Sequence, residues 1–473
     1  MLNTVKVRLQ PLVSNLNLPT VIKTAVPPGD PVEKLFIATQ VGEIFHFANG
    51  AVEMFLDIRD RIIELGANGG YDERGLLGMA FHPEFHSNGL FYLHYSVSGT
   101  QGPGALAGQF EPNPCDLETL NLHWEDRETR YDHIDTVEEW IVTEGQPEKK
   151  RTLLNLRRPF MNHNGVNSLN FSPETGKLIL TTGDGGAGYD PFNISQDNME
   201  IAGKIIEIDT SVDFGAEEPP VVTRFDQLPP PIQGALSVMA KGVRNIPGIT
   251  FQRFNNQYIK FAGNVGQNLV ESIYAFSEYD SIPVTEIVQS SEMMDTLFPW
   301  EEKEMINFGW RGWEGDLPTP IIRNCTGNFS LDDKVIAYYQ DAIATSVQRL
   351  RPLTTYYHQD NRLGKFEGTA LTGVQAYMGY PIYELTTSVV FTDLANRSDD
   401  QSPGRGVLAY TRLGPSWNPN EYALIETDYD FGDEPAFYVS LGANQEQTRL
   451  FLGVYGSTNV TDYNKGMVCE ILP

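Results

Sequence analysis

The chain has 473 residues, of which 41% are hydrophobic and 20% charged, so it holds enough apolar material for the core of a globular protein. Its 34 basic and 62 acidic residues give a net charge of −28, which argues against nucleic acid or an anionic lipid surface as a partner. No run of about 18 apolar residues and no secretion signal is visible in this numbering, so the sequence predicts no membrane span and leaves the compartment open.

Short strand-like runs bounded by Gly, Asn and Asp recur along the whole chain, whereas apolar stripes of helical period are scarce. The first pair of runs, 34–39 and 43–47, is joined at Val41-Gly42 as in a β-hairpin. The same two-run unit returns four times, at 78–83 with 90–95, 168–173 with 177–182, 248–251 with 257–261, and 439–441 with 449–454. The sequence therefore predicts an all-β fold built from repeated hairpins.

The repeated units are widely spaced. Their anchors Phe81, Phe171 and Phe251 are 90 and 80 residues apart, whereas a compact propeller blade repeats every ~40–50 residues. Two blades or long inserted loops must lie between successive units. Three stretches rich in Pro, Gly and acidic residues are predicted insertions, at 99–130, 209–235 and 280–304. We expect one domain over 1–473, with long loops on one face that shape access to the centre.

Five polar motifs occur in a fixed order along the chain. They are Asp72-Glu73-Arg74-Gly75; Asn162-His163-Asn164-Gly165 with Gly183-Asp184-Gly185-Gly186; Gly242-Val243-Arg244-Asn245; Gly263-Asn264-Val265-Gly266-Gln267-Asn268; and Asn307-Phe308-Gly309-Trp310 followed by Glu314-Gly315. Together they resemble the soluble PQQ-dependent glucose, aldose and sorbosone dehydrogenase family. The resemblance implies a six-bladed β-propeller, PQQ above its central channel, a calcium ion beside the cofactor and a small sugar as substrate. It leaves the sugar, the electron acceptor and the oligomeric state open.

The second motif supplies the predicted base. His163 lies in a polar turn that would present its ring, and the resemblance implies that it takes the proton of the sugar hydroxyl. Asp184 would orient and stabilise the imidazole, although an aspartate in such a turn can also bond its own backbone, and both interpretations stay open. The segment 183–188 also fits a dinucleotide-binding pattern, which we reject because Tyr189-Asp190-Pro191 follows where a helix should begin.

The resemblance implies roles for five further residues. Arg244 and Asn245 would contact the quinone oxygens, with Arg244 also stabilising charge during catalysis. The backbone carbonyls of Gly266 and Gln267 would bind calcium, which prefers oxygen ligands. Glu73 would line the cofactor pocket and accept a hydrogen bond from a sugar hydroxyl.

The match to the family thins beyond residue 315. Where glucose-oxidising relatives carry a lysine, this chain has Gly404, so the neighbouring Arg405 is the predicted substitute cation. Where they carry two arginines, it has Val439-Ser440-Leu441-Gly442. A tricarboxylate cofactor needs such cations, because an unpaired buried carboxylate costs several kcal/mol. Two alternatives to the dehydrogenase follow, an inactive propeller that acts as a binding or structural protein, and a calcium-dependent hydrolase or lactonase.

Overall fold

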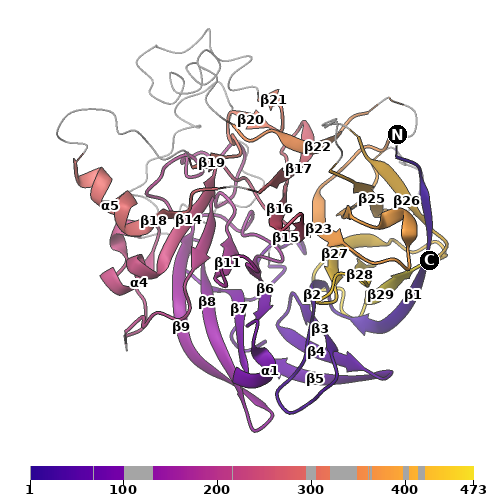
Figure 1. The fold of residues 1–473 in the computed structure, drawn as a ribbon, viewed down its shortest axis with the longest axis horizontal. Helices are drawn as coiled ribbons and strands as arrows, with labels where there is room; N and C mark the ends of the chain where they lie inside the picture. The colour runs from indigo at the N-terminus through magenta and orange to yellow at the C-terminus, as the bar shows by residue number, and fades with distance from the viewer. Residues whose placement is uncertain are drawn as a thin grey trace.

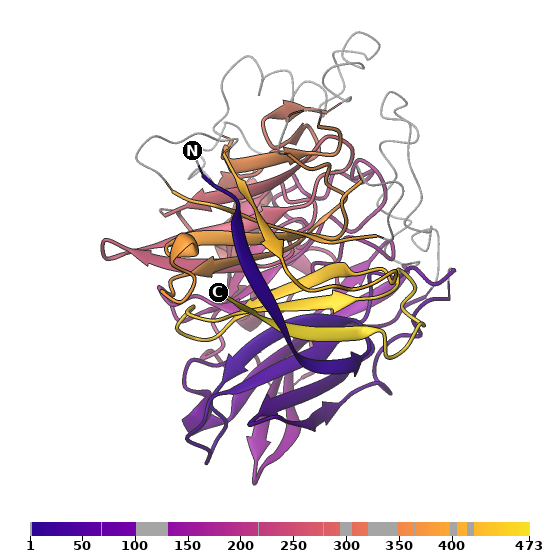
Figure 2. The same cartoon turned by 90° about the vertical axis from the view of Figure 1, so that its right-hand side faces the viewer.

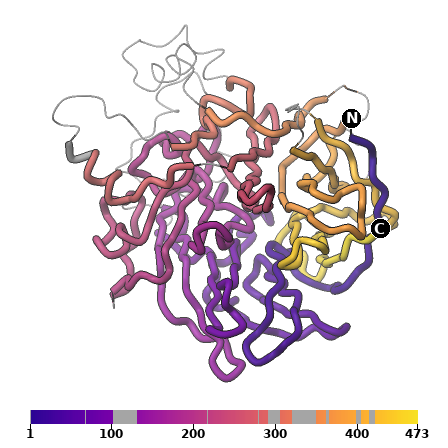
Figure 3. Tube along the Cα trace, viewed as in Figure 1, coloured from indigo at the N-terminus to yellow at the C-terminus, as the bar shows by residue number. Residues whose placement is uncertain are grey.

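The computed structural model describes residues 2–473 except 68, 101–130, 216, 278, 294–304, 320–348, 361, 363–364, 398–403 and 414–420. Antiparallel strands that follow one another in the chain make up most of its sheets (Figure 1). This arrangement confirms the predicted all-β class. Figure 3 traces the sheets in chain order around the molecule, from the indigo strands through magenta and orange to the yellow ones.

Four of the sheets belong to the first three quarters of the chain. The first sheet consists of β2 (Pro19–Ala25), β3 (Lys34–Thr39), β4 (Glu43–Ala48) and β5 (Ala51–Asp57). The second consists of β6 (Leu76–Phe81), β7 (Leu90–Ser98), β8 (His133–Thr143), β9 (Gln146–Arg158) and the short β13 (Val221–Val222). The third consists of β10 (Leu169–Phe171), β11 (Leu178–Thr181), β12 (Ile205–Ile208), β14 (Leu236–Lys241), β18 (Ile282–Pro283) and β19 (Ile306–Asn307). The fourth consists of β15 (Ile249–Phe254), β16 (Gln257–Asn264), β17 (Val270–Phe276) and β22 (Pro352–Tyr357).

The remaining large sheet has eight strands and two halves. One half is β23 (Leu371–Tyr377), β24 (Ser388–Asp393), β25 (Val407–Thr411) and β26 (Ala423–Thr427); the other is β27 (Phe437–Ala443), β28 (Leu450–Tyr455), β29 (Gly466–Leu472) and β1 (Val5–Leu16). The N-terminal strand β1 pairs antiparallel with the C-terminal β29 and parallel with β26 (Figure 2). Strands from the two ends of the chain thus complete one sheet.

All five predicted hairpins form, with the expected strands paired antiparallel. Several tight turns have the residues that such turns need. Asn49-Gly50, Glu144-Gly145 and Asn255-Asn256 each join two paired strands, and all six residues have positive φ. Two residues of positive φ are the mark of a type I′ hairpin turn, whose twist matches that of the flanking strands.

Buried apolar residues of the described chain form six clusters, and each lies between two neighbouring sheets or between the two halves of the eight-stranded sheet. Val137 of the second sheet packs in one cluster with Ile206 of the third, for example. In another, Ile22 of the first sheet joins Phe451 and Val468 near the C-terminus. When the halves of the eight-stranded sheet are taken separately, these contacts run round a closed circuit. The circuit supports the six-blade prediction, and the number of blades stays a prediction.

The wide spacing of the hairpins comes from inserted connections. The units that begin with β6, β10 and β15 are consecutive sheets, so no additional blade separates them. The 209–235 stretch joins β12 to β14 and contains β13, a short η2 helix (Phe225–Gln227) and α4 (Pro230–Ala235). The 280–304 stretch contains β18 and α5 (Val284–Met293), and its remainder at 294–304 lies outside the described residues, as does 101–130. The common face predicted for the insertions therefore stays a prediction.

Other helices are short, namely α1 (Phe85–Asn88) and η3 (Tyr383–Leu385), and a small two-stranded sheet pairs β20 (Trp313–Glu314) with β21 (Leu317–Pro318). Across the described ranges, no helix has the length and apolar character needed to cross a membrane.

Candidate active site

Strand topology brings the predicted residues to one end of the sheets. In an antiparallel pair the start of one strand lies beside the end of the next, as Leu169 opposite Leu180 illustrates. The predicted residues lie in connections that enter a first strand or leave a second strand of a sheet: Glu73, His163, Asp184, Arg244 and Gly266. Turns from three consecutive sheets therefore meet around His163.

His163 and Asp184 form a hydrogen-bonded pair. The imidazole Nδ1 lies 2.8 Å from Asp184 Oδ1, and both residues are buried, at 4% and 1% exposure. With Asp184 as acceptor, Nδ1 carries the proton and Nε2 keeps its lone pair. Among the described residues none bonds to Nε2. The pair can therefore present a neutral imidazole as a base.

A glycine makes this pairing possible. The backbone of Gly183 passes close to the His163 turn and to the Arg244 turn. A Cβ at position 183 would lie 1.9 Å from the carbonyl oxygen of His163 and 3.0 Å from that of Arg244. Contacts that short require the backbone to move, because neither obstacle is a flexible side chain. Glycine at 183 thus allows the Asp184 turn to approach both neighbouring turns.

Arg158 holds the His163 turn from beneath. Its fully buried guanidinium donates to the His163 carbonyl at 2.5 Å and to Asn164 Oδ1 at 3.0 Å. Asp135 Oδ2 lies 3.2 Å from Arg158 Nε. Burial alone would raise the pKa of Asp135, but His133 and the neighbouring His94 hold that pKa well below its usual range. Arg158 therefore keeps an ionised partner, and the positive φ of His163 (58°) is supported by charged hydrogen bonds.

Arg244 lies over the same cluster. Its guanidinium carbon is 5.5 Å from the centre of the Trp310 ring, which suits a cation–π contact. Nη1 makes a long 3.4 Å bond to the Val265 carbonyl, whereas Nε is buried and has no hydrogen-bond partner among the residues that the structure describes. A buried guanidinium with an unsatisfied donor is a feature that an anionic ligand oxygen would satisfy.

Asn245 and Glu73 connect the turns to one another. Asn245 Oδ1 accepts the Gly165 N–H at 2.9 Å, which ties the Arg244 turn to the His163 turn. Glu73 Oε2 accepts the His163 N–H at 2.7 Å, and Glu73 Oε1 accepts the Tyr71 hydroxyl. Both predicted cofactor residues thus lie at the cluster, and both have one oxygen engaged by the backbone of the 162–165 turn.

The predicted metal-binding turn follows Val265, whose carbonyl accepts Arg244 Nη1. The N–H of Gly266 donates to Glu271 Oε2 at 3.3 Å, and the N–H of Gln267 donates to Glu314 Oε2 at 3.0 Å. Gln267 Oε1 accepts the N–H of Tyr189 at 2.9 Å. Within the described ranges no group of three or more His, Cys, Asp or Glu side chains could hold a metal, so a cation here would depend on backbone carbonyls.

Arg405 makes its contacts with a neighbouring loop of its own part of the chain. Its guanidinium donates to the backbone carbonyls of Gly432 and Glu434 and lies 5.7 Å from the Phe431 ring. A side chain at Gly404 would also have to displace the Phe437 ring, since a Cβ there would lie 2.4 Å from it. None of the contacts found between described residues joins Arg405 to the His163 cluster, and its role as a cofactor cation stays a prediction.

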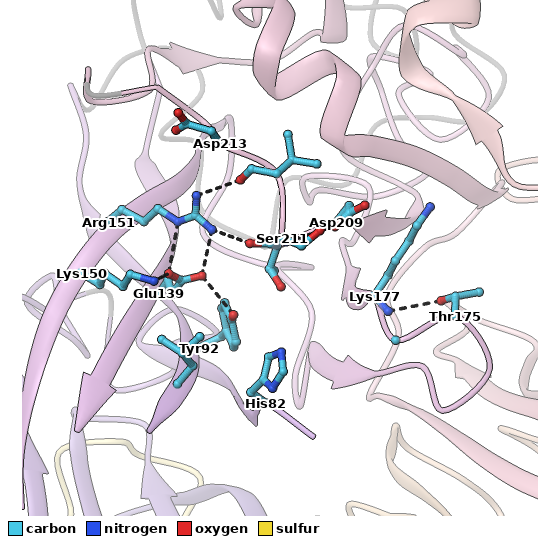
Figure 4. Close-up of a pocket in the computed structure, with 14 residues that line it drawn as sticks. His82, Tyr92, Glu139, Lys150, Arg151, Thr175, Lys177, Asp209, Ser211 and Asp213 are labelled. Carbon is cyan, nitrogen blue, oxygen red and sulfur yellow. Dashed lines mark hydrogen bonds and ion pairs between the residues drawn. The ribbon is translucent and has the colours of Figure 1, made fainter. Parts of the chain in front are cut away.

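A separate cavity of about 700 Å³ lies between the second and third sheets (Figure 4). Three of its charged groups pair with one another: Glu139 binds Lys150 at 2.8 Å and Arg151 at 3.0 Å, and it also accepts the Tyr92 hydroxyl at 3.0 Å. Arg151 also donates to the carbonyls of Thr210 and Val212. Glu139 and Arg151 are thus engaged with each other and with their neighbours, which favours the His163 cluster as the candidate site.

Sequence reasoning missed three supporting residues. Trp310 donates its indole Nε1–H to Asp184 Oδ2 at 2.7 Å, although its loop was recognised as a motif. Arg158 belongs to no motif quoted for the site, and Glu314 follows the tryptophan motif without a role of its own. Arg158 is the last residue of β9, where the sequence reads as an ordinary strand and does not indicate a site residue. The role of Glu314 can be recognised only once the turn that it contacts is known.

Comparison with known proteins identifies the family. A family model described as glucose/sorbosone dehydrogenase matches residues 29–280, which is more than half of the chain. The chain belongs to this family. The match includes the turns that carry His163, Asp184, Arg244 and Gly266, and it confirms the resemblance seen in the sequence.

Solved structures of sugar dehydrogenases share the fold of this family member. The PQQ-bound aldose sugar dehydrogenase of Streptomyces coelicolor is 14% identical, with a TM-score of 0.54 over 99% of both chains. The apo form of the soluble aldose sugar dehydrogenase of Escherichia coli is 12% identical, with a TM-score of 0.52 over 99% of this chain and 100% of that one. At such identities the likeness establishes the β-propeller fold alone.

Curated relatives of this family member carry other names. The HIPL1 protein of Arabidopsis thaliana is 27% identical over 39% of this chain and 28% of its own length. The human Hedgehog-interacting protein is 28% identical over 44% of this chain and 26% of its own length. The aligned parts span about a quarter to two fifths of the curated relatives.

Proposed function

We propose that the chain is a quinoprotein sugar dehydrogenase that oxidises an aldose-type sugar with PQQ and calcium, His163 being the general base. The observation that carries the proposal is the His163–Asp184 pair, whose 2.8 Å bond leaves Nε2 available at a cluster of turns from three sheets. A base oriented by a carboxylate is the arrangement that proton removal from a hydroxyl requires.

Oxidation of an aldose at its anomeric carbon removes two electrons and two hydrogens, and converts the C–O single bond into a carbonyl. In the proposed reaction the hydroxyl proton moves to His163 Nε2, while the carbon-bound hydrogen leaves with its electron pair as hydride. Asp184 stabilises the imidazolium that forms. Glu73 accepts a hydrogen bond from a second sugar hydroxyl. PQQ, when bound, supplies the two-electron acceptor for the hydride.

The residues around Arg244 fit an anionic cofactor in one respect. The unpartnered, buried Nε–H of Arg244 suits a quinone oxygen, and Asn245 lies beside it. In contrast, β27 contributes no cation, since its Ser440 hydroxyl binds the Pro19 carbonyl at 2.6 Å and its neighbours are apolar. We therefore expect PQQ to bind, with an affinity below that of relatives that hold each carboxylate with a cation.

Titration of the purified protein with PQQ in the presence of calcium, followed by absorption, tests the proposal. A saturable spectral change, together with reduction of an artificial electron acceptor by aldoses, is the expected result. Absence of binding at micromolar PQQ, with no turnover of an aldose panel, would overturn it.

A second candidate function is protein binding without redox chemistry. Two observations favour it: the cation-free β27, and curated relatives that include Hedgehog-interacting proteins. A chain of this kind would bind no PQQ and would retain the folded His163 cluster. The same titration therefore separates the two functions, because saturable PQQ binding contradicts the second one.

A further inference from the structure

A single carboxylate organises the turn that holds the predicted calcium ligands. Glu314, in β20, is 3% exposed. Its Oε2 accepts the backbone N–H groups of four consecutive residues, at 3.0 Å from Gln267, 3.2 Å from Asn268, 2.9 Å from Leu269 and 3.3 Å from Val270. Successive N–H groups directed at one anion form a concave backbone nest.

No cation neutralises this carboxylate within the described part of the chain. Arg349 pairs instead with Asp316, two residues after Glu314, at 3.0 Å. The charge of Glu314 is therefore balanced by backbone dipoles. All four N–H groups point at the same carboxylate oxygen. The carboxylate therefore fixes the orientation of each peptide group that donates to it.

Peptide geometry then dictates where the carbonyl groups point. In a planar trans peptide the N–H of one residue and the C=O of the residue before it point in opposite directions. Because the N–H groups of Gln267 and Asn268 point at Glu314, the carbonyls of Gly266 and Gln267 point away from it. The carbonyl of Leu269, paired in the same way with the Val270 N–H, accepts the N–H of His358 at 3.1 Å instead.

Gly266 lets the turn close around the carboxylate. A Cβ at this position would lie 1.9 Å from the Val270 carbonyl oxygen and 2.8 Å from Glu314 Oε2. The carbonyl of Gly266 accepts none of the hydrogen bonds that join described residues. Two neighbouring carbonyls directed to the same side, with the anion behind them, are suitable ligands for a hard cation.

We propose that Glu314 is a positioning residue, which directs the carbonyls of Gly266 and Gln267 toward a bound divalent cation of the calcium type. This inference rests on the calcium site of the proposed function. Oε2 of Glu314 is occupied by four N–H donors, so this oxygen positions the turn and does not bind the cation.

Calorimetric titration of the apo protein with Ca²⁺ alone tests the proposal, using three variants. Glu314→Ala removes the acceptor, and we expect it to weaken Ca²⁺ binding at least ~10-fold. Glu314→Gln keeps an oxygen acceptor without the charge, so it should retain most of the affinity. Asp316→Asn removes a charge from the same segment, where the carboxylate pairs with Arg349, and should leave the affinity unchanged.

A second readout separates positioning from charge attraction. Hydrogen exchange of the apo protein should show faster exchange at the amides of residues 267–270 in Glu314→Ala than in the wild type, with Glu314→Gln in between. Equal loss of Ca²⁺ affinity in the Ala and Gln variants would overturn the positioning role in favour of charge. Wild-type protein that binds no Ca²⁺ overturns the calcium site and this inference together, whereas unchanged affinity in Glu314→Ala overturns this inference alone.

Discussion

The indole Nε1–H of Trp310 donates to Asp184 Oδ2 at 2.7 Å, on the carboxylate whose other oxygen binds the His163 ring. Asp184 Oδ1 also accepts the Gly186 N–H at 2.9 Å. The indole ring stacks on Tyr189, with ring centres 6.2 Å apart, and the Arg244 guanidinium also lies over it. These two neighbours support the position of the ring. Trp310 thus fixes the carboxylate that orients the proposed base.

Replacement of Trp310 by Phe tests this support. Trp310→Phe keeps an aromatic ring beneath Arg244 but removes the donor to Asp184. We expect kcat/KM for aldose oxidation to fall by about 10- to 100-fold, because a hydrogen bond to a charged group contributes about 1.5–3 kcal/mol. Trp313→Phe is the matched control, since Trp313 packs against Arg349. Equal losses in the two variants would contradict the specific role of Trp310.

His163→Ala should lower the rate of aldose oxidation by about 10²–10⁴-fold, since that is the usual contribution of a general base. The measurement is steady-state turnover with an artificial electron acceptor and PQQ-loaded protein. His46→Ala serves as the control, because His46 pairs with the exposed Glu53 on the surface of the first sheet. An active His163→Ala protein would require another base.

Gly183→Ala should damage both stability and activity. The added Cβ would meet the His163 carbonyl at 1.9 Å, so the turn must shift and the His163–Asp184 bond must lengthen. Gly234→Ala adds the same methyl group within α4, where nothing lies within 4 Å. Thermal unfolding and turnover of both variants provide the measurement. Similar unfolding midpoints for the two would show that the 183 turn has more room than its contacts indicate.

A buried acid away from the site gives stability a pH dependence. Burial raises the pKa of Asp393 to about 7, and the charge of Glu271 adds to the effect. Because its ordinary pKa is 3.8, the folded protein keeps this proton between pH 4 and 7 while the unfolded chain releases it. Asp393 therefore makes its full contribution to the free energy of unfolding below about pH 4. It falls by up to ~1.4 kcal/mol per pH unit as the pH rises to 7.

Asp393→Asn should flatten this slope, as measured by urea unfolding at intervals from pH 4.5 to 7.5. Asp57→Asn is the control, because Asp57 lies on the surface and its Arg59 partner lowers its pKa. The control should therefore leave the slope in this range unchanged. A slope that persists in Asp393→Asn would assign the titration to another group.

Local pattern was enough to predict the strands. Two strand-like runs with Gly or Asn at the turn between them encode a hairpin within about 15 residues. The pairing of β15 with β16 could therefore be predicted from residues 248–261. The turn motifs likewise identified His163 and Asp184, because each residue of a motif can be matched to the corresponding position of the family's motif.

The contacts between the turns needed the tertiary structure. Glu73 and His163 are 90 residues apart, and Asp184 and Trp310 are 126 apart. Such distances close only when sheets pack around a common centre, which no local pattern encodes. The same packing places the Arg405 guanidinium against the carbonyls of Gly432 and Glu434, contacts that its position beside Gly404 did not reveal. Sequence by itself thus determined the strands and the reactive residue types, and the packing of the sheets decided which of them meet.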